Sequence, residues 1–168
     1  MKVIPQLKIE LLFDGFPYFG DPPTEVQYYS DYFGKTGEDD AIYSISWRRG
    51  ALGHEITHRD YGPAVIYYYR NKNKKKEEWY LDGLHTRADD GPTTTTYYEN
   101  GMKLADEWYS VNRHYGRSRE DDLPAAITYY PTGQVKYEEW FLYGKKFREN
   151  GKPTLIKYDT NGKVLYEM

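Results

Sequence analysis

Runs of strand-forming residues alternate along this chain with turn residues. Residues 92–98, PTTTTYY, are β-branched and aromatic, and a proline suits the first residue of a strand. Asn100-Gly101 follows and favours a type I′ hairpin turn, because both residues accept positive φ, so a return strand is expected over residues 102–109. Asp82-Gly83 is a second hairpin signal. No segment combines helical spacing of apolar residues with helix caps, so the pattern predicts a succession of β-hairpins.

The hairpin pattern recurs in a fixed register. An aromatic pair or its remnant lies five and six residues after each recurring proline, and a tryptophan lies sixteen residues after three of them. The residues in this register are Pro23, Pro63, Pro92, Pro124 and Pro153, then Trp47, Trp79, Trp108 and Trp140, and the pairs Tyr68-Tyr69, Tyr97-Tyr98 and Tyr129-Tyr130. We expect the tryptophans, with the prolines from Pro63 onward, to form a structural ladder along one face. Neighbour-on-neighbour contacts would provide most of the stability of such an array.

A longer period of 61 residues is superimposed on the first. Residues 47–107 and 108–168 align without a gap, and 20 of the 61 positions are identical. We therefore divide the chain into residues 1–46, an N-terminal strand with a degenerate first repeat, and two repeat pairs, 47–107 and 108–168, in one continuous repeat domain. The predicted fold is all-β, with tandem β-hairpins forming an elongated, twisted meander or a solenoid-like sheet.

Composition supports this fold and narrows the function. The chain has 20 tyrosines, whose rings tolerate a half-exposed sheet face. The formal net charge of −3 gives no general attraction to nucleic acid or to an anionic membrane, and the absence of cysteine excludes disulfides and thiolate chemistry. The start, MKVIPQLKIELLF, is interrupted by Pro5, Lys8 and Glu10 and has no long apolar run. We expect a soluble, intracellular protein without a transmembrane segment.

Two stretches carry a resemblance to a known repeat type. Residues 79–87, WYLDGLHTR, and 57–64, THRDYGPA, resemble the "WYx(D/N)GxxHRxDGPA" repeats of large DNA viruses, especially Marseillevirus-like giant viruses, and of phages, which are described as MORN-repeat or MORN-variant proteins. The resemblance covers residues 47–168 well and 11–46 loosely. It implies an all-β repeat scaffold without assigned chemistry, located in a virion or in the cytoplasm of an infected host. MORN arrays elsewhere are associated with protein and membrane-lipid contacts.

The chain departs from the repeat pattern in its last units. Leu123 and Lys152 replace the turn glycine before a proline, and the His-Arg pair is absent from the last two units. A role in which every unit presents the same ligand is therefore not expected.

The polar residues of the motif recur at fixed distances before the prolines. Three arginines lie five residues before a proline and one lies four before, and an aspartate lies three before in three units. These residues are Arg87, Arg119, Arg148 and Arg59, with Asp89, Asp121 and Asp60. Catalytic sites are normally singular, so recurrence favours a structural role, in which the acid caps the turn and the arginine pairs with it or with exposed carbonyls. We expect no catalytic residue and no cofactor.

One stretch matches a metal-binding motif literally. The string HEITH, with His54, Glu55 and His58, fits HExxH, which binds zinc only when it is helical. On a strand the two histidines would lie about 13 Å apart, too far for one zinc ion. A zinc hydrolase is therefore a remote alternative.

A lysine-rich run is the second alternative site. Lys72, Lys74, Lys75 and Lys76 could contact phosphates, with neighbouring tyrosines for base stacking, as in a nucleic-acid-binding protein. The simpler interpretation is a solvated hairpin tip whose lysines discourage pairing between sheet edges.

The leading hypothesis is a non-enzymatic scaffold or protein-binding protein. A face lined by tyrosine and tryptophan would contact a protein partner or a second copy in a homodimer, because exposed aromatic patches mark interfaces. The candidate interface residues are Tyr68, Tyr69, Tyr97, Tyr98, Tyr129 and Tyr130.

Overall fold

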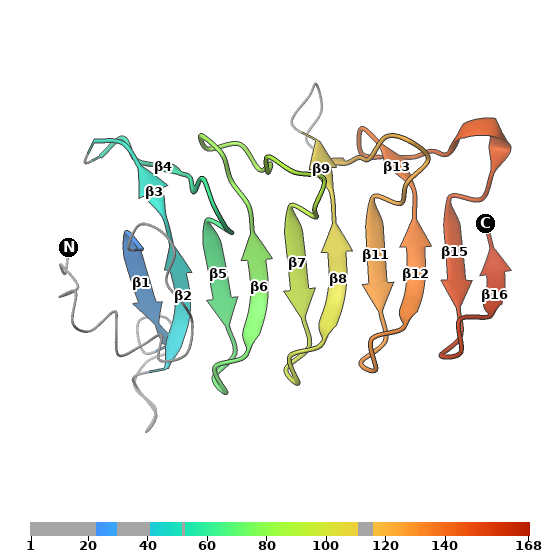
Figure 1. Cartoon of the computed structure of the whole chain (residues 1–168), viewed down its shortest axis with the longest axis horizontal. Helices are drawn as coiled ribbons and strands as arrows, with labels where there is room; N and C mark the ends of the chain where they lie inside the picture. Colours follow the sequence, from blue (N-terminus) through green and yellow to red (C-terminus); the bar gives the residue numbers. More distant parts are fainter. Residues whose placement is uncertain (1–22, 30–40, 52, 111–115) are drawn as a thin grey trace.

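The computed structural model describes residues 23–29, 41–51, 53–110 and 116–168 (Figure 1). The all-β prediction is confirmed: ten strands form one antiparallel sheet, and neighbours in the sheet are also neighbours in the chain. The strands are β1 Glu25–Tyr28, β2 Ile42–Ser46, β5 Val65–Tyr68, β6 Lys74–Glu78, β7 Thr94–Tyr97, β8 Lys103–Glu107, β11 Ala126–Tyr129, β12 Val135–Glu139, β15 Leu155–Tyr158 and β16 Val164–Glu167.

The two ends of the strands carry different connections. Longer loops with small hairpins lie at one end, which we call the loop edge, and tight turns lie at the other, the turn edge (Figure 1). The small elements at the loop edge are β3 Arg48–Arg49 with β4 Ile56–Thr57, β9 Tyr109–Ser110 with β10 Gly116–Arg117, β13 Phe141–Leu142 with β14 Lys145–Lys146, an isolated bridge between Leu81 and Leu84, and the 3-10 turn Glu149–Gly151. Side chains on this edge are therefore held by loops that are themselves hydrogen-bonded.

The strands follow the period of 61 residues, and one loop does not. β5 and β11, β6 and β12, and β7 and β15 each start 61 residues apart. In the loop after the first tryptophan of each pair, the backbone N–H of His58 donates to Trp47, and that of Ser118 donates to Trp108. These equivalent residues are 60 apart, so the ungapped alignment is wrong inside this loop. A loop outside the ten-stranded sheet tolerates a difference of one residue in length, whereas the same difference within a strand would shift its pairing register.

The turn edge differs from the prediction at Asn100-Gly101. Only Gly101 has a positive φ, +87°; its N–H donates to Tyr98, and the N–H of Tyr98 donates to Met102. This is a three-residue loop with a glycine in the left-handed conformation and a bulge beside it, not a type I′ turn. The predicted hairpin at Asp82-Gly83 is confirmed, and both of its residues have positive φ.

Buried side chains change in character along the sheet. At its first strands, Ile45, Trp47 and Ile66 form an aliphatic and aromatic cluster. In the middle, the same face buries Thr95 and Asp106, which are cross-strand partners joined by a hydrogen bond of 2.7 Å. These two buried polar side chains therefore satisfy each other across the sheet, as their burial requires.

Candidate binding surface

Each of the four tryptophans predicted to form a ladder lies under an arginine guanidinium. The distance from Cζ to the indole centroid is 3.7 Å for Arg59 over Trp47, Arg87 over Trp79 and Arg148 over Trp140, and 4.1 Å for Arg119 over Trp108. Such contacts are attractive because the ring face is electron-rich. We call each pair a Trp–Arg unit. The recurring arginine is thus explained by a stacked contact that sequence reasoning missed, although the recurrence of an arginine four or five residues before each proline was its signal.

The recurring prolines complete these units. In every unit the arginine Nη1 donates to the carbonyl of the proline that lies two residues before the next strand of the sheet, at distances of 3.0 to 3.4 Å. The backbone N–H of the tryptophan donates to the carbonyl of the residue after that proline, which ties the start of the loop to its end. The proposed pairing of arginine with exposed carbonyls therefore agrees with the geometry.

Acidic residues stabilise two of the units further. Asp89 forms an ion pair with Arg87, and Asp122 accepts from Arg148 Nε at 2.8 Å and from Lys152 Nζ at 2.5 Å. Hydrogen bonds from these cations lower the pKa of both carboxyl groups below the usual value. The predicted capping role is met at Asp89, whose Oδ1 accepts from the N–H of Gly91.

The second tyrosine of each pair ties one hairpin to the next at the turn edge. Its hydroxyl donates to the carbonyl of the first tyrosine one unit further along. The contacts run from Tyr69 to Tyr97, from Tyr98 to Tyr129 and from Tyr130 to Tyr158, each 2.8 Å long. These side chains therefore serve contacts inside the sheet.

The first tyrosine of the pair points to the preceding unit instead. Tyr97 donates to Glu77 at 2.5 Å, and Tyr129 donates to Asp106 at 2.9 Å. Burial, together with these carboxylates, raises the pKa of both phenols well above the usual range. Burial and Glu77 likewise raise the pKa of Tyr68 to about 12. All six tyrosines of the candidate interface are half-buried, and whether they also meet a partner stays a prediction.

Half of the lysine run is engaged by acids. Lys74 pairs with Glu77 at 2.6 Å and Lys76 with Glu78 at 2.5 Å, whereas Lys75 lies over the Tyr69 ring. Lys72 occupies the position of the turn glycine, with φ of +70°. These pairings leave less positive charge for a phosphate backbone than the sequence indicates.

The HEITH stretch is not helical, so it lacks the geometry that the zinc motif requires. β4 covers its centre, His54 is exposed in the loop before β4, and His58 is buried after it. The ring of His58 accepts from the N–H of Asp82 at 3.0 Å and lies 3.1 Å from Asp60. Among the described residues, no group of three or more side chains is arranged to hold a metal ion.

The loop edge carries most of the exposed large apolar side chains, a feature that sequence reasoning did not identify. Among the residues that the structure describes, eleven such side chains are exposed, and six of them lie there: Ile56, Tyr61, Leu84, Leu123, Tyr143 and Phe147. Exposed apolar side chains gathered on one edge mark an interaction surface.

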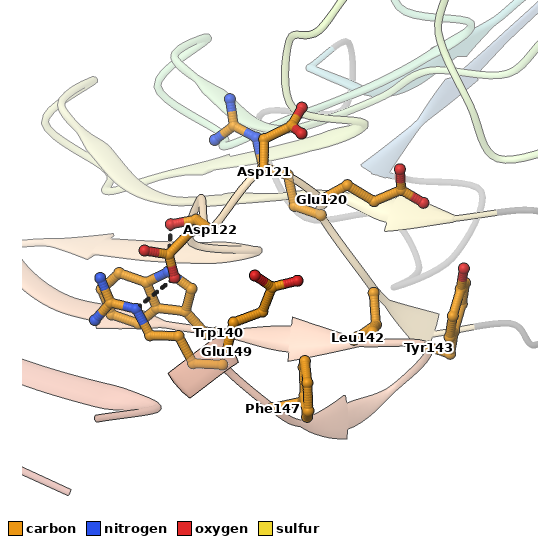
Figure 2. A pocket seen from close by; sticks show the side chains of 10 residues that line it. Glu120, Asp121, Asp122, Trp140, Leu142, Tyr143, Phe147 and Glu149 are labelled. Atoms are coloured by element: carbon orange, nitrogen blue, oxygen red, sulfur yellow. Dashed lines mark hydrogen bonds and ion pairs between the residues drawn. The ribbon is translucent and has the colours of Figure 1, made fainter. Parts of the chain in front are cut away.

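A groove of about 300 Å³ opens on this edge between the loop 119–122 and the segment 140–149. Figure 2 shows Leu142, Tyr143 and Phe147 on one side of it and Glu120 and Asp121 on the other. Sequence reasoning missed the groove because its two walls come from different loops. Its one sequence signal is that Tyr143 and Phe147 replace Asp82 and Thr86 of the first repeat pair.

The described part of the chain contains no helix with both the length and the apolar character needed to span a bilayer. A scan against protein-family models, a search of curated proteins and a search of solved structures each found no match to this chain.

Proposed function

We propose that this protein is a non-enzymatic scaffold, a tandem array of β-hairpins that binds another protein through its loop edge. The observation that carries the proposal is the gathering of exposed apolar side chains on that edge, above a row of Trp–Arg units. The resemblance to viral repeat proteins supports a location in a virion or in the cytoplasm of an infected host.

The recurring polar residues support a scaffold rather than an enzyme. The arginines stack on tryptophans and donate to proline carbonyls, and the same arrangement occurs four times. A loop fixed at both ends by such contacts displays its side chains with little loss of conformational entropy on binding. Binding residues commonly lie on loops positioned by a rigid framework.

Photo-crosslinking tests which edge meets the partner. A photoreactive phenylalanine analogue replaces Leu84 or Leu123 on the loop edge, and Glu99 or Thr132 on the turn edge serves as the matched control; all four residues are exposed. In a lysate of the cells that make the protein, a discrete adduct should form from the loop-edge positions and not from the turn-edge positions. Adducts from the turn edge alone, or from no position, would contradict the proposal.

A further inference from the structure

The groove on the loop edge carries carboxylates that nothing described in the chain neutralises. Glu120, Asp121 and Glu149 line it, and none of them forms an ion pair within residues 23–29, 41–51, 53–110 and 116–168. The fourth acid of the lining, Asp122, is held by Arg148 and Lys152. Of the two arginines in the lining, Arg148 pairs with Asp122, and Arg119 lies over the Trp108 ring and donates to the Pro124 carbonyl.

Aromatic and aliphatic side chains form the rest of the groove. Leu142, Tyr143 and Phe147 lie along one wall, and the Glu149 carboxyl is directed into the space beside them (Figure 2). Phe147 is 48% exposed and Tyr143 is 39% exposed, although each is large and apolar. Tyr143 also adopts a φ of +49°, which a bulky residue adopts only at a cost. These side chains are poorly explained by packing within the chain.

The first repeat pair carries different residues at the same place. The counterparts of Tyr143 and Phe147 there are Asp82 and Thr86, and Ala88 stands in place of Glu149. Asp82 pairs with Arg49 and lies 3.3 Å from His58 Nδ1, while Asp60 lies 3.1 Å from the same ring. Asp82 is therefore engaged within the first pair, whereas the second pair exposes acids and aromatic rings at this place.

We propose that this groove binds a basic segment of a protein partner and takes one of its arginine or lysine side chains; this rests on the proposed function. The aliphatic part of the side chain would lie against Leu142 and Phe147, and its charged end would meet the carboxylates. Charge complementarity selects the occupant, because the three carboxylates attract a cation. The aromatic rings add a cation–π contact that a purely acidic surface lacks.

The test is a titration of the isotope-labelled chain with a nine-residue peptide of sequence GRSGRSGRG. Binding is measured by NMR, from the chemical-shift changes of Tyr143, Gly144 and Phe147. Replacing Glu120, Asp121 and Glu149 together by Gln, Asn and Gln should weaken binding roughly tenfold, because the attracting charges are gone. Phe147→Thr, which installs the residue of the first pair, should weaken it roughly fivefold. The same peptide with citrulline for arginine has no charge and should not bind.

A matched control separates the groove from general charge effects. Replacing Glu55, Glu99 and Glu167 by Gln removes the same formal charge outside the groove, and should change binding less than about twofold. Equal losses from the two triple variants, equal binding of the citrulline peptide, or no binding by the unaltered chain would overturn the proposal. The photo-crosslinked adduct from Leu84, which lies outside the groove lining, reports on the proposed function separately.

Discussion

Substituting Gly91 by alanine tests the Trp–Arg unit through the sign of its effect. Gly91 does not have a positive φ, so alanine is compatible with its backbone. At such a site alanine normally stabilises a protein by about 0.4–1 kcal/mol, because it restricts the unfolded chain. Here the added Cβ would lie 2.5 Å from Nη1 and 2.8 Å from Nη2 of Arg87, and closer still to Cζ, so the guanidinium must move.

The cost follows from what holds that guanidinium. Arg87 lies 3.7 Å above the Trp79 ring, donates to the Pro92 carbonyl at 3.0 Å and donates to Asp89 at 2.8 Å. The stacking contributes about 0.5–2 kcal/mol and each net hydrogen bond about 1 kcal/mol. Since part of this is regained by relaxation, we expect Gly91→Ala to lower the free energy of unfolding by about 1–3 kcal/mol. For a chain of this length, the thermal midpoint would fall by about 2–4 °C per kcal/mol.

The assay is thermal unfolding followed by circular dichroism, with a second background as control. In an Arg87→Ala chain no guanidinium stands beside residue 91, so Gly91→Ala should then be neutral or stabilising. This change of sign isolates the contact from any effect of alanine on the unfolded state. A Gly91→Ala chain that is more stable than the parent would refute the reasoning.

Three further outcomes follow from the described contacts. Tyr98→Phe removes the hydrogen bond to the Tyr129 carbonyl and should lower the free energy of unfolding by about 1 kcal/mol in denaturant titrations, whereas Tyr61→Phe, at an 85% exposed position, should have no effect. Lys72→Gly removes the steric cost of a left-handed backbone at a residue with a side chain, and should raise the free energy of unfolding by about 1 kcal/mol. A loss of stability would contradict the assigned turn. Burial lowers the pKa of His85 below 6.5, so the stability that its neutral ring contributes is present above pH 6.5 and is lost as the pH falls. The difference between the unfolding midpoints of the parent and of His85→Gln should therefore be smallest at pH 5.

The strand pattern was predictable because it depends on local chemistry. The proline before each strand, the aromatic pair at its end and the turn glycine fix where a hairpin starts and stops, so the strand ending at Tyr97 and the turn at Gly101 were found in advance. The turn type at Gly101 was not found, because Asn100-Gly101 is compatible with two loop geometries, and the bulged one allows the Asn100 side chain to accept from the N–H of Met102.

The candidate surface depended on distances that spacing alone does not supply. Arg87 and Trp79 recur with their proline in every unit, yet nothing local says that the guanidinium lies on the ring. Predicting the groove would have required knowing how two loops lie relative to each other, since Glu120 and Phe147 come from different loops. Comparing the two repeat pairs position by position marks Tyr143 and Phe147 as departures, which is the closest that sequence reasoning comes to this site.

Lengthening the array tests the repeat scaffold most directly. A second copy of residues 47–107, inserted after Glu107, places a new Trp47 where Trp108 stands now and a new β5 beside β8, in the register that β11 uses. Because each unit is stabilised by its neighbours, the longer chain should unfold in one cooperative transition, at or above the parent's denaturant midpoint. A separate transition of lower stability, or an unfolded insert, would contradict the account.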